Sequence, residues 1–341
     1  MDRKNFIRTS SAIVAASCLP IPGKARSQLV DPDKKFIIPP YLNKGDVIGI
    51  TSPAGYITEE EMLPAIRLIE SWGFKIKLGT SIGKRDFTFG GTDEERLHDL
   101  QYMLNSNDVQ AILCARGGYG SVRIVDRIKW NHFVAKPKWV IGFSDITVLH
   151  AHISRLNIAS IHSKMTNSFP GDPATADDLQ MQTIESIRQS ISGEKMFYET
   201  PPSEFNRPGV TTGRLIGGNL RTLETLAGTS SDILTAGKIL FLEDTGEYMY
   251  SIDRMFWNLK RTGKLSSLKG LIIGGFGVKT DDEGDEFGKT IYDVVMEKIS
   301  SYKYPVCFHF PVGHQRNNYA LKCGVEHRLI VNSTNCTLAE I

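Results

Sequence analysis

Cysteine is scarce in this sequence, and the cysteines present follow no metal-binding pattern. Five occur in 341 residues, and one of them, Cys18, lies in the N-terminal stretch. The spacings of the other four match no CxxC pair and no zinc motif; these are Cys114, Cys307, Cys323 and Cys336. Cys114 lies in the apolar run AILCA and is predicted to be a buried core residue, while the last three could form one disulfide at most. The sequence is therefore no disulfide scaffold, and we expect no metal site.

An excess of charge of one sign is also absent. Lys and Arg number 40 against 38 Asp and Glu, for a net charge of +2, and no dense basic stripe occurs. A chain of this kind is not expected to neutralise the phosphates of a nucleic acid. The glycine-rich motifs GxGxxG and GxxxxGK[ST], which bind nucleotide phosphates, are missing as well. We therefore predict neither a nucleic-acid partner nor a cofactor.

The sequence has no apolar run long enough to cross a membrane, for which about 20 residues are needed. Residues 1–27 instead combine a basic start, an apolar stretch from Ala12 to Leu19, and small residues near Ala25. This order is typical of a secretory signal peptide, and DRKNFIR resembles a twin-arginine motif with Lys4 in place of the second arginine. We expect export to the periplasm with cleavage near Ala25. Two alternatives are a lipid anchor on Cys18, which follows VAAS, and a disordered cytoplasmic tail.

The length of the chain favours two domains, which would leave a cleft between them. In residues 38–165, short β-branched runs that end at glycine alternate with segments of helical periodicity. The first strand is predicted in GDVIGITSPAG, and VRIVDRI is predicted to be one of the helices. Strands that alternate with helices form a parallel sheet covered on both sides. This part is predicted to be a doubly wound α/β domain of the flavodoxin or Rossmann type.

The remainder of the chain differs in composition and in sequence pattern. Residues 166–208 are richer in Pro, Ser, Asp and Gln and are predicted to connect the domains, with a helix within ADDLQMQTIESIRQSI. Residues 209–341 contain short strand-like runs and few helical ones. They predict a second, mixed domain with an antiparallel or barrel-like sheet.

The segment VIGFSDIT, residues 140–147, places Ser144 and Asp145 at a strand-to-helix corner. Ligands of open α/β sheets bind at the carboxyl ends of the strands. A serine at this corner could attack a carbonyl group if a base took its proton, and the amide of Asp145 could then bind the oxyanion. The alternative is structural, because Ser and Asp also commonly cap helices.

Further residues with catalytic potential lie elsewhere in the chain. His314 is the best placed of the eight histidines as a base, because it follows a predicted strand and Gly313 in FPVGHQRNN. An acid could come from the end of KILFLEDTGE, where Glu243, Asp244 and Glu247 are all available. The glycines of RGGYG, at 117, 118 and 120, would let backbone amides approach a reacting atom closely.

Eight motifs in order make the chain similar to a known family. GDVIGITSPAG, ARGGYGSVRIVDRI, VIGFSDIT, GGNL, ILFLEDTGE, YSIDRMFWNLKRTG, LIIGGFG and PVGH, within residues 40–328, resemble the LD-carboxypeptidases. This group contains muramoyltetrapeptide carboxypeptidase and the microcin C self-immunity proteins. The resemblance implies a serine peptidase with Ser144 as nucleophile, Glu243 as acid and His314 as base. It also implies an oxyanion hole built from the amide of Asp145 and that of Gly117 or Gly118.

The activity implied by the resemblance is hydrolysis of an L-to-D peptide bond that releases terminal D-alanine from a murein tetrapeptide. Arg116 would then bind a substrate carboxylate, since a guanidinium can donate two parallel hydrogen bonds to a carboxylate. Arg116 could equally form a structural ion pair. Two other functions stay open: an amidase of the microcin-immunity type acting on peptidyl or aminoacyl nucleotides, and an exported two-lobed binding protein without catalysis. A homodimer is one alternative for the oligomeric state.

Overall fold

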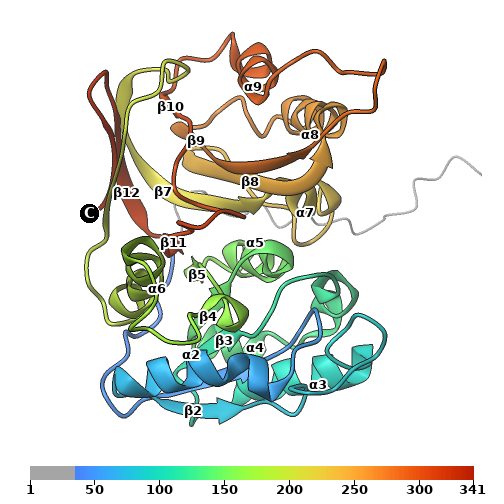
Figure 1. Ribbon diagram of the computed structural model, residues 1–341, viewed down its shortest axis with the longest axis vertical. Helices are drawn as coiled ribbons and strands as arrows, with labels where there is room; N and C mark the ends of the chain where they lie inside the picture. Colours follow the sequence, from blue (N-terminus) through green and yellow to red (C-terminus); the bar gives the residue numbers. More distant parts are fainter. Residues whose placement is uncertain (1–34) are drawn as a thin grey trace, which may run out of the picture. The chain divides into compact units, whose positions relative to one another are not determined.

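The computed structural model describes residues 35–341 (Figure 1). The predicted signal peptide, with Cys18 and the cleavage site near Ala25, lies outside these residues. Within residues 35–341, none of the helices combines the length and apolar character that spanning a membrane requires. The described residues form one compact unit with two β-sheets.

The first sheet has six strands in the order β11-β5-β4-β3-β1-β2. The first five along the chain are parallel: β1 (Val47–Thr51), β2 (Lys75–Leu78), β3 (Ala111–Cys114), β4 (Trp139–Gly142) and β5 (Ser160–His162). Their order 2-1-3-4-5 is that of the flavodoxin-like doubly wound sheet. The predicted fold class of the N-terminal part is confirmed.

Helices connect these strands and begin where the sequence provides caps. They are α2 (Glu59–Ser71), α3 (Asp93–Asn105), the short α4 (Asn131–Ala135) and α5 (Thr147–Arg155). Thr58 and Thr92 each accept a hydrogen bond from the backbone of a glutamate three residues later, whose side chain bonds back to the threonine amide. Such capping boxes satisfy amides that a helix leaves unpaired, and loss of an N-cap typically costs about 1 kcal/mol. The predicted helix in VRIVDRI is instead two 3-10 turns, Ser121–Arg123 and Val125–Arg127.

The two faces of the first sheet bury different helices because side chains alternate along each strand. In β3, Ala111 and Leu113 contribute to one core and Ile112 and Cys114 to the other. Residues of α2 and of α6 (Asp178–Ile191) fill the first core, and residues of α3, α4 and α5 fill the second. Cys114 is fully buried, as its apolar context predicted.

The second sheet has seven strands in the order β10-β9-β8-β7-β12-β13-β6. Four neighbours are parallel, namely β7 (Gly209–Asn219), β8 (Lys238–Tyr248), β9 (Gly270–Lys279) and β10 (Val306–Cys307). The antiparallel part consists of β12 (Glu326–Val331), β13 (Cys336–Glu340) and β6 (Phe197–Thr200). A mixed second domain was predicted, but with an antiparallel or barrel-like sheet, whereas four of the seven strands are parallel. Its helical content was underestimated, since α7 (Leu220–Thr225), α8 (Met249–Arg261) and α9 (Ile291–Ile299) connect the parallel strands.

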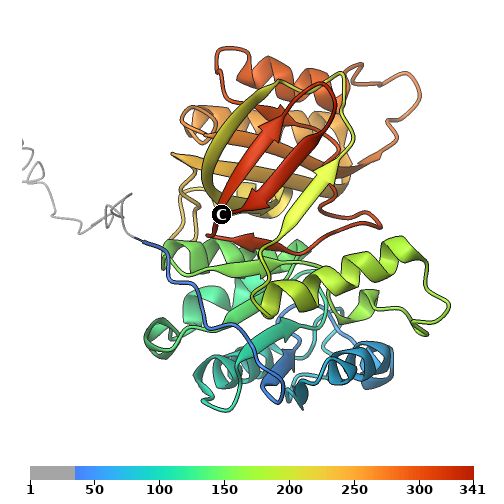
Figure 2. The same ribbon diagram turned by 90° about the vertical axis from the view of Figure 1, so that its left-hand side faces the viewer.

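Two segments tie the sheets together. In residues 166–208, α6 packs on the first sheet and β6 joins the second. Later in the chain, β11 (Leu321–Cys323) leaves the C-terminal part and pairs antiparallel with β5 of the first sheet; Figure 2 shows this red strand beside the green ones. The loop between β10 and β11, which carries His314, therefore runs from the second sheet to the edge of the first. The exact division into domains stays a prediction.

Candidate active site

Ser144 follows Phe143, the residue directly after the carboxyl end of β4, and lies in a 3-10 turn that leads into α5. Its φ of 62° is in the left-handed region, which few residues other than glycine adopt. The strain of such a backbone is of the order of 1–3 kcal/mol and is tolerated where the surroundings fix it. Here the carbonyl of Gly142 accepts hydrogen bonds from Ser163 N and His150 Nε2, at 3.0 and 2.8 Å. The corner therefore holds Ser144 in a conformation that a relaxed chain would avoid.

The structure brings Ser144, His314 and Glu243 into one hydrogen-bonded chain. His314 Nε2 is 3.2 Å from Ser144 Oγ, and His314 Nδ1 is 2.7 Å from Glu243 Oε2. Glu243 is at the carboxyl end of the apolar run of β8 and is fully buried, whereas His314 is partly exposed. A neutral imidazole that donates a hydrogen bond from Nδ1–H to Glu243 has an unprotonated Nε2, which can accept the proton of the serine hydroxyl.

Gly313 makes the approach of His314 to Glu243 possible. Its φ is +104°, and a Cβ atom at this position would lie 2.7 Å from Glu243 Oε2. Glycine is the residue that fits both the backbone conformation and the close contact. The Gly313 amide donates to Asn318 Oδ1 at 2.8 Å, which fixes the loop before the histidine.

The two other acids considered from the sequence have different partners. Asp244 points away from Glu243, as the alternation along a strand predicts, and accepts hydrogen bonds from Asn219 Nδ2 and the amide of Arg221 at 3.0 and 2.9 Å. Burial raises the pKa of Asp244 to about 6. Glu247 accepts from Ser251 Oγ at 2.8 Å. Neither acid forms a hydrogen bond with His314.

The structure does not support the alternative that Ser144 or Asp145 caps the following helix. The N-terminus of α5 has no side-chain cap, and neither does the 3-10 turn before it. Asp145 Oδ2 instead accepts a hydrogen bond from the amide of Ser121 at 2.8 Å. The Asp145 carboxylate thus connects the strand-to-helix corner to the end of the glycine-rich loop. This role was not predicted from the sequence.

The glycine-rich turn after β3 lies against Ser144. A Cβ atom on Gly117 would lie 2.9 Å from the Cβ of Ser144, so a larger residue would crowd the serine. The Gly117 carbonyl accepts from the amide of Gly55 at 2.8 Å, which holds the turn against the loop after β1. Among the described residues, the amides of Gly117 and Gly118 have no hydrogen-bond acceptor. They are available to a ligand beside Ser144.

Arg116 is exposed at the edge of this turn. Its Nη1 is 3.4 Å from the carbonyl of Tyr56, and it forms no ion pair with another described residue. The structural ion pair considered from the sequence is therefore not found in the described part of the chain. The assignment of Arg116 to a substrate carboxylate stays a prediction.

A lysine that sequence reasoning missed lies on the other side of the site. Lys164 follows the end of β5, its Nζ lies 5.6 Å from the centre of the Phe143 ring, and that ring lies 4.9 Å from the His314 ring. Burial lowers the pKa of Lys164, while the nearby Glu243 acts in the opposite direction. The available signal was its position after a parallel strand, where ligand-binding residues gather.

The arrangement as a whole can perform acyl transfer. A serine hydroxyl in contact with an imidazole, which a buried carboxylate orients, is the constellation that activates serine as a nucleophile on several unrelated folds. No group of three or more His, Cys, Asp or Glu residues able to hold a metal ion occurs between residues 35 and 341. The chemistry that Ser144, His314 and Glu243 offer is nucleophilic and acid–base.

Comparison with known proteins identifies the class to which this fold and site belong. The family model described as the LD-carboxypeptidase N-terminal domain matches residues 48–163, and the model of the LD-carboxypeptidase C-terminal domain matches residues 212–329. The two matches cover more than half of the chain. The chain belongs to the LD-carboxypeptidase family.

Individual relatives agree with this assignment. The chain is 33% identical to the "Probable murein peptide carboxypeptidase" of Bacillus subtilis strain 168, over 84% of this chain and 90% of the relative. It is 30% identical to the murein tetrapeptide carboxypeptidase of Pseudomonas aeruginosa, over 81% of this chain and 91% of the relative. The crystal structure of muramoyltetrapeptide carboxypeptidase from Oxalobacter formigenes matches with a TM-score of 0.77 and 25% identity, over 86% of this chain and 98% of that one.

Proposed function

We propose that this protein is a serine carboxypeptidase that hydrolyses an L-to-D peptide bond and releases the terminal D-alanine of murein tetrapeptides. The observation that carries the proposal is the hydrogen-bonded chain from Ser144 through His314 to the buried Glu243. The choice of substrate is supported by the relatives, two of which are named for murein peptides.

In the first half of the reaction, Ser144 Oγ attacks the carbonyl carbon of the scissile bond and its proton passes to His314 Nε2. The carbonyl oxygen becomes an oxyanion, which the amide of Asp145 and an amide of the glycine turn, at Gly117 or Gly118, stabilise. Loss of one such donor typically lowers kcat by about 10² to 10³. The carbon–nitrogen bond then breaks, and the proton on Nε2 moves to the nitrogen of the leaving D-alanine.

In the second half, water replaces the leaving amine. It attacks the acyl-enzyme carbonyl and gives a proton to His314 Nε2. The bond to Ser144 Oγ breaks, the proton returns to the serine, and the shortened peptide leaves with a new carboxyl group. The enzyme is restored, so that one peptide bond and one water molecule are consumed in each cycle.

Glu243 acts through its charge and its position. It is fully buried, and among the described residues its Oε1 has no hydrogen-bond partner. A buried carboxylate that is incompletely solvated gains stabilisation when the facing imidazole becomes positively charged. Because the imidazole is charged in both transition states, Glu243 lowers both barriers.

Export is a second part of the proposal, and it rests on the sequence of residues 1–27. An exported enzyme would meet wall peptides in the periplasm, before they are taken up. Mass spectrometry of the protein isolated from its native envelope tests this proposal. Cleavage near Ala25 is the expected result, a lipid on Cys18 would indicate an anchored protein, and an intact Met1 in the cytoplasm would contradict export.

The activity is tested by incubating the protein without residues 1–27 with a defined murein tetrapeptide and weighing the products. The expected products are the tripeptide and D-alanine. A parallel sample with an aminoacyl nucleotide tests the amidase alternative, since a microcin C7 self-immunity protein of Escherichia coli is 26% identical over 88% of this chain. Cleavage of the nucleotide conjugate alone would contradict the proposal, and cleavage of neither would favour a binding protein.

A further inference from the structure

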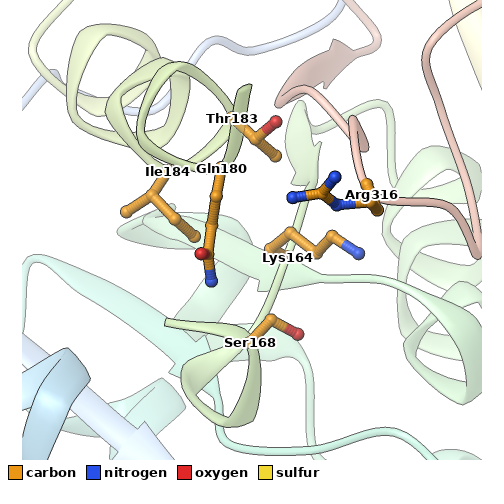
Figure 3. A pocket seen from close by; sticks show the side chains of 6 residues that line it. All are labelled: Lys164, Ser168, Gln180, Thr183, Ile184 and Arg316. Carbon is orange, nitrogen blue, oxygen red and sulfur yellow. The ribbon is translucent and has the colours of Figure 1, made fainter. Parts of the chain in front are cut away.

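A cavity of about 220 Å³ opens beside the loop that carries His314. Lys164 and Arg316 line it together with Ser168 and three residues of α6, Gln180, Thr183 and Ile184. In Figure 3, the side chains of Lys164 and Arg316 lie beside each other, with those of Gln180 and Ile184 on the other side of the view. The volume is below the range of about 300–1,000 Å³ that drug-sized ligands occupy. It suits one small amino acid.

The cavity is electrostatically suited to an anion. Lys164 forms no ion pair with any described carboxylate; its Nζ donates to the backbone carbonyl of Gln315 at 2.7 Å and has further donors to offer. Arg316 is paired through Nη2 with Asp177, the residue that caps α6. Asp177 thereby holds the guanidinium at the cavity and leaves its other N–H groups available.

The position of the cavity relative to the site indicates which part of a substrate would enter it. Gln315 and Arg316 directly follow His314, and Lys164 lies beside Phe143, which precedes Ser144. In a serine peptidase the base gives its proton to the leaving amine, so the leaving residue must lie on the side of the histidine. The oxyanion donors at Gly117, Gly118 and Asp145 belong to other loops. The cavity is therefore on the leaving-group side.

We propose that Lys164 and Arg316 form the subsite that binds the free terminal carboxylate of the leaving amino acid. An enzyme that removes only the last residue must recognise a carboxylate there, and a lysine together with a guanidinium provides charge-assisted hydrogen bonds to it. The inference rests on the proposed function and deepens it. The subsite explains how cleavage is confined to the end of a peptide, because a chain that continues would place an uncharged amide between the two cations.

The test compares two substrates that differ only at this group, the tetrapeptide ending in D-alanine and the same peptide ending in D-alaninamide. For the unchanged enzyme we expect kcat/KM to be about 100-fold lower with the amide. Lys164→Met should lower kcat/KM for the peptide acid at least tenfold and change kcat/KM for the peptide amide by no more than about twofold. The preference of the enzyme for the acid over the amide should therefore become smaller. Arg316→Gln should also lower kcat/KM for the peptide acid more than kcat/KM for the peptide amide. Lys269→Met, which removes an exposed lysine outside the site, is the matched control and should change neither value.

A binding measurement separates this inference from the proposed function. D-alanine, the leaving group itself, is titrated by NMR into Ser144→Ala with and without Lys164→Met. Saturable binding that weakens at least tenfold with the lysine change, and that D-alaninamide does not reproduce, supports the subsite even if the tetrapeptide is not cleaved. Equal rates with acid and amide, or a Lys164 variant that slows both substrates equally, would overturn it while D-alanine release still supported the proposed function.

Discussion

His314 is attached to Glu243 at two points: its ring Nδ1 and its backbone amide both lie at Oε2 of the carboxylate, at 2.7 and 3.2 Å. One oxygen therefore fixes both the position of the loop and the orientation of the ring. Of the two neutral tautomers, the one with a proton on Nδ1 suits this arrangement, and it leaves Nε2 directed at Ser144.

Glu243→Gln is expected to lower kcat by on the order of 10³ to 10⁴, because an amide cannot balance the imidazolium and can favour the wrong tautomer. The melting temperature should change little. Asp244→Asn and Glu247→Gln, whose partners are Asn219 and Ser251, should each cost about tenfold or less. Parallel steady-state kinetics of the three variants checks this. A larger loss from either neighbour would show that another carboxylate orients the base.

Ser144→Ala should abolish turnover and leave the fold nearly intact, since the serine caps no helix. Ser144→Gly makes a sharper test, because glycine adopts the positive φ of this corner without strain. We expect Ser144→Gly to be inactive and more thermostable than the unchanged protein, with a gain of about 1 kcal/mol in unfolding free energy. Thermal melting and turnover are measured together. Residual activity above a few per cent in both variants would exclude Ser144 as the nucleophile.

Gly117→Ala should reduce kcat more than it reduces stability. The added methyl group would lie 2.9 Å from Ser144 Cβ and would push the serine or the turn out of place. A displaced oxyanion donor typically costs about 10² to 10³ in rate. Gly171→Ala is a useful control, because Gly171, like Gly117, has no positive φ, but no neighbour lies near its Cβ position. Equal kinetic effects of the two substitutions would indicate a general effect of the added methyl group rather than crowding of the site.

Three buried histidines should make the protein less stable in mild acid. Burial lowers the pKa of His150 and of His327 to about 4, and that of His162 well below its ordinary value. Below about pH 6.5 the unfolded chain binds protons at these positions that the folded chain does not. Stability is therefore complete above pH 6.5 and is lost toward pH 4, by up to about 1.4 kcal/mol per pH unit for each histidine.

Urea unfolding of His327→Gln at pH 7 and pH 5 checks this dependence. The variant should lose less unfolding free energy between the two pH values than the unchanged protein does, whatever its stability at pH 7. His98→Gln alters an exposed histidine and should keep the original slope. Asp244 has the opposite effect on the pH dependence of stability. Because its pKa is raised in the folded protein, its contribution to the unfolding free energy falls as the pH rises toward 6. An unchanged slope for His327→Gln would refute the assignment.

Much of the fold could be predicted from local patterns. Apolar runs that end at glycine and alternate with capped helices predict a doubly wound sheet, since each element is determined by nearby residues. The pairing of β11 with β5 could not be predicted, because Leu321–Cys323 is a three-residue strand whose partner lies some 160 positions away. The 3-10 turns in VRIVDRI also escaped prediction, because their periodicity over a few residues resembles that of a short α-helix.

The residues of the candidate site, too, could be predicted from the sequence only in part. Ser144 and His314 could be singled out because each follows an element end, where the backbone presents a side chain. The residues alone left three acids open, and only the direction of each side chain on β8 separates Glu243 from Asp244. Lys164 and Arg316 were missed because they are 152 positions apart (316 − 164), and only the folded loops bring them to one cavity.

Ser144 is expected to carry the acyl group during turnover, and an inhibitor that traps the serine covalently tests this expectation. An aryl phosphonate analogue of the tetrapeptide, with phosphorus in place of the scissile carbonyl carbon, is incubated with the protein, and the digested product is mapped by mass spectrometry. We predict a single phosphonyl adduct on Ser144, absent from Ser144→Ala and formed much more slowly by the Glu243→Gln variant. An adduct on a different residue, or D-alanine release by Ser144→Ala at the rate of the unchanged enzyme, would contradict it.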